Sequence, residues 1–152
     1  MAQTKYLCKA LNATILIATI AANTMAAAQN YRKFSNESAA DASQVFCRST
    51  VVRLPNVNMA QCRETQLVDS GAKSVNGTSL YTRDVKPDDA KLRVLVLGGI
   101  HGDEMSSTSV ALHWINLIKQ NPTEVHWRFI PLLNPDGLQA KPSKRVNARG
   151  VD

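Results

Sequence analysis

His101 and Glu104 are the residues whose types and spacing first suggest chemistry. They lie three positions apart in Gly98-Gly99-Ile100-His101-Gly102-Asp103-Glu104, which follows an apolar run and precedes a helical pattern. A neutral imidazole and a carboxylate would supply two of the three protein ligands of a His₂Glu zinc site, whose remaining ligand would be a distant histidine. A bland alternative needs no metal: Asp103 could be a helix N-cap, and Glu104 a first-turn acid favoured by the helix dipole.

Two further motifs follow that junction. The first is Asn134-Pro135-Asp136-Gly137, which by itself is an ordinary turn signal. The second is the basic stretch from Lys141 to Asp152, which contains Arg145 and by charge alone would be a solvated loop. Neither motif indicates a site without the other and without the His-x-x-Glu junction.

The elements around these motifs read as α/β. Leu92 to Leu97 is a short apolar run, typical of a strand buried on both faces. Glu104 to Gln120 repeats apolar residues at three- and four-residue steps, which predicts a helix with one core-facing stripe that includes Trp114. Val125 to Leu133 is a second strand candidate, limited near its end by Pro131.

This strand–helix–strand order predicts a right-handed βαβ unit with parallel strands. It places the His101 junction at the carboxyl end of a strand, where ligands gather in open α/β sheets. Upstream, Asn76-Gly77 separates Lys73–Val75 from Leu80–Val85, which predicts a hairpin.

The amino terminus has the order of a secretory signal peptide. Lys5 and Lys9 precede the apolar run of 13 residues from Ala10 to Ala22, and small residues follow up to Ala28. A membrane anchor is the alternative, but 13 helical residues span about 20 Å against roughly 30 Å of bilayer core. We therefore expect residues 1–28 to be removed and the protein to be exported, periplasmic or secreted, without a stable membrane anchor.

An exported chain gives its cysteines a specific interpretation. Cys47 and Cys62, fifteen positions apart, are expected to form a disulfide, although two unrelated thiols or a metal site are alternatives. No Cys-x-x-Cys motif accompanies them. The expected organisation is a signal peptide over 1–28, a polar, aperiodic and flexible lead-in over 29–44, and one domain over 45–152.

Composition excludes several function classes. The 152 residues are 44% hydrophobic and 5% aromatic, which does not fit collagen-like, low-complexity or wholly disordered chains. Removal of the first 28 residues lowers the net charge from +6 to +4. The remaining positive charge is dispersed and not interleaved with aromatic residues, so we expect no nucleic-acid partner.

Together the three motifs resemble the zinc carboxypeptidase family (peptidase M14), and more closely its bacterial murein peptide amidase-like branch. The matching stretches are residues 99–104, 134–137 and 145–152, within a resemblance that runs from about Leu92 to Asp152. The resemblance implies an α/β fold in which this chain forms the incomplete amino-terminal part of a mixed, largely parallel sheet flanked by helices.

The resemblance also implies roles for individual residues. His101 and Glu104 match the first two zinc ligands. Arg145 best matches the arginine that helps to polarise the scissile carbonyl, with Lys144 and Arg149 leaving its register open. The implied cofactor is Zn²⁺, and the implied substrate is a peptide with a free carboxylate, such as a cell-wall peptide.

The chain departs from the family pattern after Asp152. In the family, Gly-Val-Asp continues into Leu-Asn-Arg-Asn, whose Asn and Arg hold the substrate carboxylate, and the third zinc ligand, a pocket tyrosine and the general-base glutamate lie further on. His113 and His126 are expected to be structural and too distant to replace that ligand. We therefore expect a truncated enzyme with little or no activity alone.

Two alternatives to a peptidase stay open at this point. Succinylglutamate desuccinylases and aspartoacylases use a similar His-x-x-Glu junction to cleave N-acyl amino acids. The other alternative is a non-catalytic fragment in which Glu104 only begins a helix.

Overall fold

A computed structural model describes residues 23–33, 37, 41–121 and 123–152 of the chain. The chain divides into two compact units, residues 1–37 and residues 38–152. In the first unit, residues 23–33 and 37 are helical, whereas the apolar run of the predicted signal peptide lies outside the described residues. None of the described helices combines the length and apolarity needed to cross a membrane.

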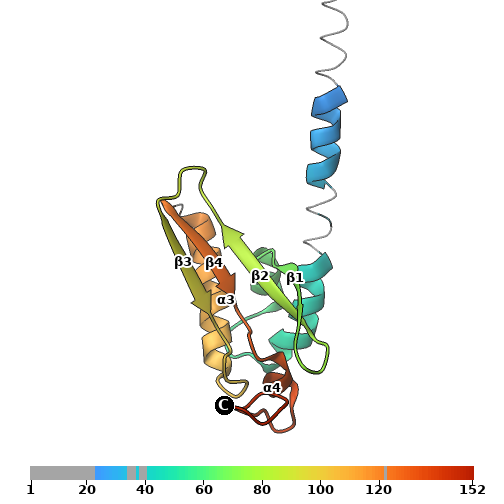
Figure 1. The fold of residues 1–152 in the computed structure, drawn as a ribbon, viewed down its shortest axis with the longest axis vertical. Helices are drawn as coiled ribbons and strands as arrows, with labels where there is room; N and C mark the ends of the chain where they lie inside the picture. Colours follow the sequence, from blue (N-terminus) through green and yellow to red (C-terminus); the bar gives the residue numbers. More distant parts are fainter. Residues whose placement is uncertain (1–22, 34–36, 38–40, 122) are drawn as a thin grey trace, which may run out of the picture. The chain divides into compact units, whose positions relative to one another are not determined.

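The second unit is a mixed α/β structure (Figure 1). After a helix over 41–50, its elements are η1 (Val51–Arg53), α2 (Met59–Glu64), β1 (Val68–Lys73), β2 (Ser79–Val85), β3 (Leu92–Leu97), α3 (Met105–Gln120), β4 (Val125–Ile130) and α4 (Pro135–Gln139). The strand order is β1-β2-β4-β3. The predicted mixed α/β class is confirmed, with β3 and β4 forming a parallel pair and the pairs of β2 with β1 and β4 antiparallel.

The predicted βαβ unit is present. β3 and β4 pair in parallel register from Leu92↔Val125 to Leu97↔Ile130, and α3 connects them. β4 ends at Ile130, short of the predicted Leu133, because Pro131 has no backbone N–H to extend the ladder. The loops after β3 and β4 therefore begin side by side at one end of the sheet.

The core lies between the sheet, α3 and the segment before β1, which contributes Phe46, Cys47 and Cys62 among others. Phe129, Leu112 and Ile115 are almost completely buried there. The prediction that Trp114 belongs to the core-facing stripe is wrong, since its side chain is 48% exposed. At 100° per residue, Trp114 points well away from the direction that Leu112 and Ile115 share, and Leu112 takes its place in the core.

The lead-in expected over residues 29–44 contains more regular structure than the sequence indicated. Its described parts, 29–33, 37 and 41–44, are helical, and the helix that begins at residue 41 continues to residue 50. This helix has a core-facing stripe, because its buried residues recur at three- and four-residue steps: Ser43, Phe46, Cys47 and Thr50. The polar segment before the helix makes this stripe hard to recognise in the sequence. The predicted disulfide joins Cys47 to Cys62 of α2.

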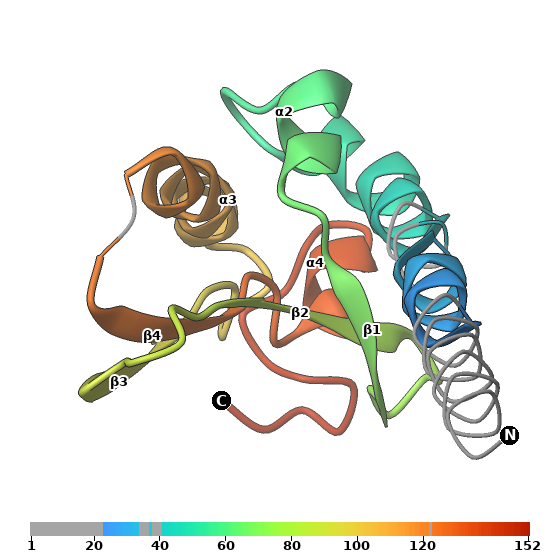
Figure 2. The ribbon, with the colours of Figure 1, turned by 90° about the horizontal axis from the view of Figure 1, so that it is seen from above.

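β3 is less buried than its apolar sequence predicts. The expectation of burial on both faces is wrong: Leu92, Leu95 and Leu97 are 58%, 57% and 41% exposed. Figure 2 shows α3 and α2 on the same side of the sheet. Among the described residues, β3 is an edge strand that α3 covers on one face only.

Candidate metal centre

His101 and Glu104 meet in the loop that leads from β3 into α3. The hydroxyl of Ser107 accepts a hydrogen bond from Gly99 N–H and donates one to the Glu104 carbonyl, which fixes the path of this loop. Glu104 occupies the N-cap position of α3, but its side chain does not cap the helix. The carboxylate is instead turned back toward His101, with His101 Nδ1 and Glu104 Oε2 3.1 Å apart.

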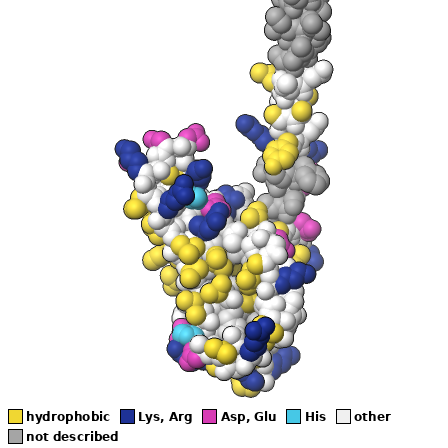
Figure 3. Space-filling view, in the orientation of Figure 1, with side chains coloured by type: hydrophobic (Ala, Val, Ile, Leu, Met, Phe, Trp, Pro, Cys, Tyr) yellow, Lys and Arg dark blue, Asp and Glu magenta, His cyan; other side chains and the backbone are white. Residues whose placement is uncertain are grey.

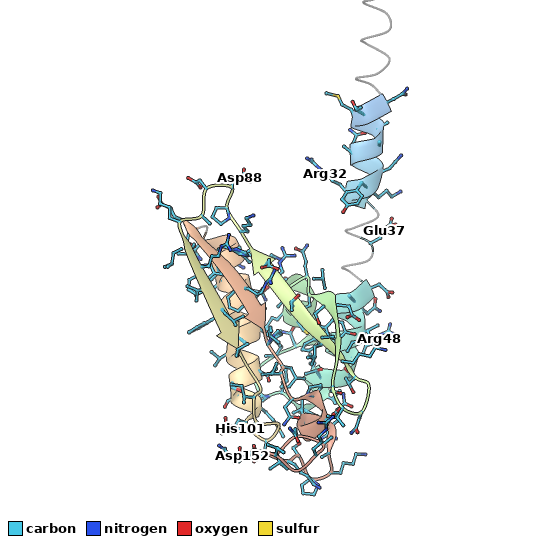
Figure 4. The ribbon with its side chains drawn as sticks, in the orientation of Figure 1. Arg32, Glu37, Arg48, Asp88, His101 and Asp152 are labelled. Carbon is cyan, nitrogen blue, oxygen red and sulfur yellow. A yellow bond between two sulfur atoms is a disulfide. The ribbon has the colours of Figure 1, made fainter. Side chains whose placement is uncertain are left out.

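The two ring nitrogens of His101 have different surroundings. Nε2 lies 3.1 Å from Oδ1 of Asp152 (Figure 4 labels both residues, at the same end of the unit). Nδ1 is buried and makes no hydrogen bond. A histidine binds a metal through a ring nitrogen that carries no proton, so Nδ1, which has no hydrogen-bond partner, is the nitrogen available to a metal ion.

The donor set fits a zinc ion as two of its ligands. Imidazole nitrogen and carboxylate oxygen are zinc ligands, and two bonds of about 2.1 Å at near-tetrahedral angles separate their donors by roughly 3.1–3.4 Å. The distance from His101 Nδ1 to Glu104 Oε2 lies in that range. In the part of the chain that the structure describes, no group of three His, Cys, Asp or Glu residues is arranged to hold a metal.

Arg145 completes the polar cluster around these residues. Its Nη1 donates to Glu104 Oε1 and its Nε donates to Asp152 Oδ2, both at 2.9 Å. Contact with His101 and the hydrogen bond from Arg145 lower the pKa of the Glu104 carboxyl below its usual value, so this group stays ionised. The hydrogen bond to Asp152 raises the pKa of Arg145 above its usual value.

Asn134 connects the Asn-Pro-Asp-Gly motif to the loop that carries Arg145. Its side-chain oxygen accepts from Gly137 N–H at the start of α4, and its side-chain nitrogen donates to the carbonyls of Arg145 and Val146. Asn134 N–H also donates to the carbonyl of Gly99, which joins the motif to the loop after β3. A motif that looks like a simple turn therefore positions Arg145.

Gly102 brings the His-x-x-Glu loop against α4. A Cβ atom on Gly102 would lie 2.2 Å from both the Gly137 carbonyl carbon and the Leu138 nitrogen. At this position the absence of a side chain allows the backbone of the loop to approach the backbone of α4 closely. A positive φ is found nearby, at Gly99, with φ 53°.

The other histidines of the described chain lie elsewhere, as expected. His113 Nε2 contacts the carbonyl of Asn56 at 2.9 Å. His126 Nε2 contacts Asp84 Oδ1 at 2.7 Å. Asp152, in contrast, lies in this cluster beside His101 and Arg145, although its residue type and spacing predicted no role for it. Only its position in the third motif could have indicated one.

Comparison with known proteins adds an independent line of evidence. The family model described as "Zinc carboxypeptidase" matches residues 57–152. Carboxypeptidase SOL1 of Arabidopsis thaliana is 30% identical over 106 residues, which cover 60% of this chain and 21% of that protein. The chain thus spans about a fifth of the length of this relative.

Two solved structures that share low sequence identity with this chain are also similar to it. Carboxypeptidase A of Helicoverpa armigera shares 16% identity at a TM-score of 0.49, over 78% of this chain and 36% of that one. Bovine thrombin-activatable fibrinolysis inhibitor, solved with tick carboxypeptidase inhibitor, shares 20% identity at a TM-score of 0.46, over 53% of this chain and 29% of its own.

Proposed function

The chain belongs to the zinc carboxypeptidase family, and we propose that His101 and Glu104 bind Zn²⁺ in a site for peptide-bond hydrolysis. The observation that carries this proposal is the buried Nδ1 of His101, which has no hydrogen-bond partner and lies 3.1 Å from a Glu104 oxygen. A buried nitrogen of this kind is costly unless a ligand satisfies it.

Each residue of the cluster has a separate task in this proposal. His101 and Glu104 would hold zinc, which when bound would supply polarisation of a carbonyl and a water whose pKa is lowered toward about 7. Asp152 holds His101 through Nε2 and keeps Nδ1 directed toward the metal position. Arg145 is positioned by Asp152 to donate to the oxygen of a substrate carbonyl, where negative charge develops.

The substrate class is also a proposal. We expect a peptide with a free carboxylate, and cell-wall peptides are the first class to test, as in the murein peptide amidase-like branch. The order of Lys5, Lys9, an apolar run and small residues supports export of the protein. An exported enzyme would meet such peptides outside the cytoplasm.

The chain by itself is expected to turn over little substrate. Its described residues supply two zinc ligands, and the coordination shell of a catalytic zinc site needs a third. The direct test is titration of the full chain with Zn²⁺ against a chromophoric chelator. One weakly bound zinc per chain supports the proposal, whereas no binding above that of a His101→Ala variant would reject it.

Replacing Arg145 with alanine should tighten zinc binding about two- to fivefold. The guanidinium occupies Glu104 Oε1 and adds a positive charge, and because an ion pair this exposed is weak, its removal should change the affinity only a few-fold. Competition titrations of the two proteins give the ratio.

Arg149→Ala is the matched control, since it removes the same charge from the same loop. An equal gain in both variants would show a general effect of charge, and weaker binding in Arg145→Ala would contradict the predicted competition.

A further inference from the structure

The ion pairs that hold Arg145 against Glu104 lie at the surface. The side chains of Arg145, Glu104 and Asp152 are each about half exposed. Figure 3 shows acidic, basic and histidine side chains gathered at the end of the unit where Figure 4 labels His101 and Asp152. Exposed ion pairs contribute little, because water and salt screen their charges and two long side chains lose conformational freedom. The position of Arg145 therefore depends on what holds the backbone of its loop.

The guanidinium of Arg53 contacts the segment that leads from α4 into this loop. Nη1 donates to the carbonyl of Ala140 and to the hydroxyl of Ser143, and Nη2 donates to the carbonyl of Gln139, each at 3.3 Å. The last carbonyls of a helix have no partner within the helix, so a cation with several donors suits them. Arg53 thus attaches both the end of α4 and a residue two positions before Arg145.

Arg53 is itself on a segment that is bonded to α3. It is the last residue of η1, within the stretch of chain that the disulfide closes. Just after η1, the carbonyl of Pro55 accepts a hydrogen bond from Ser109 Oγ, and the carbonyl of Asn56 lies 2.9 Å from His113 Nε2. α3 begins at the proposed metal site. This route therefore connects the loop to that site independently of the exposed ion pairs.

We propose that Arg53 is a positioning residue for Arg145. Asn134 bonds the carbonyl of Arg145 itself, and Arg53 fixes the start of the loop, so together they set the distance between the guanidinium of Arg145 and the carboxylate of Glu104. This inference rests on the proposed function for what Arg145 does, but not for where Arg145 lies.

Hydrogen exchange of the full chain, followed by mass spectrometry, tests this proposal with Arg53→Ala. The amides of residues 139–147 should exchange about fivefold faster, the change that loss of one ordinary hydrogen bond produces in a local opening equilibrium. Arg63→Ala is the matched control, because the Arg63 guanidinium donates within α2, to the carbonyl of Met59. The control should leave exchange over residues 139–147 as in the wild type.

Zinc titration supplies a readout that a merely structural role would not change. If Arg53 acts through Arg145, Arg53→Ala should tighten zinc binding by up to about fivefold, no more than Arg145→Ala does. It should have no further effect in the Arg145→Ala variant, since the two changes share one route. Arg53→Lys keeps the stem and the charge, but its single nitrogen cannot span the separate acceptors of Nη1 and Nη2. It should therefore show the same changes at smaller size, even if Arg53→Ala does not fold.

Two outcomes would overturn the proposal. The first is unchanged exchange over residues 139–147 in both Arg53 variants. The second is an equal change of zinc affinity with and without Arg145, because Arg53 would then act on the fold as a whole. A wild-type chain that binds no zinc would reject the proposed function instead, and the exchange comparison would still decide whether Arg53 holds the loop.

Discussion

Replacing His101 with alanine should weaken zinc binding by more than about 100-fold, since changes to residues that merely support a ligand already cost 10–100-fold. The variant removes one of the two proposed ligands and leaves Glu104 to contact Arg145 alone. Competition titration with a chromophoric chelator measures the loss. Co²⁺ absorption provides a second readout, because it reports on nitrogen coordination.

His113→Ala is the matched control for this prediction. It removes an imidazole from the same unit, but one that contacts the carbonyl of Asn56, away from the Glu104 carboxylate. The control should bind zinc as the wild type does. Equal losses in both variants would indicate non-specific zinc binding by histidines and would contradict the assignment of His101. Thermal unfolding of each variant separates loss of a ligand from loss of the fold.

The βαβ unit was predictable because its signals are local. The apolar run of β3 and the repeat of α3 each lie within one segment, and the handedness rule connects them. Burial was less predictable, because it depends on neighbours distant in sequence. Leu95 has the sequence environment of a buried strand residue, yet β3 lies at the edge of the described sheet.

The same distinction between local signals and contacts with distant residues applies to the candidate site. His101 and Glu104 were identifiable by residue type and spacing, because both are in one loop. The contacts of Arg145 with Glu104 and Asp152 depend on how the last loop folds back, and residue spacing does not encode this. The role of Asn134 was concealed for a similar reason, since its amide acts on carbonyls eleven and twelve residues away.

The contact between Gly102 and α4 connects the stability of the fold to the geometry of the site. Gly102 lies between the two proposed zinc ligands, and its neighbours across the contact are backbone atoms of Gly137 and Leu138. Backbone cannot move aside as the end of a flexible side chain can. A larger residue at position 102 must therefore displace either the loop that carries His101 or the turn that positions Arg145.

Gly102→Ala should accordingly weaken zinc binding at least about tenfold, a loss typical of misplaced ligands. It should also lower the free energy of unfolding by about 1–3 kcal/mol, the usual cost of overpacking. Gly71→Ala is the control. Its added Cβ meets open space, and the only strain comes from the positive φ at this position, so the free energy of unfolding should fall slightly and zinc binding should be unchanged. Chelator competition and chemical denaturation measure the two effects. Wild-type zinc affinity in Gly102→Ala would show that the His101 loop does not depend on this contact.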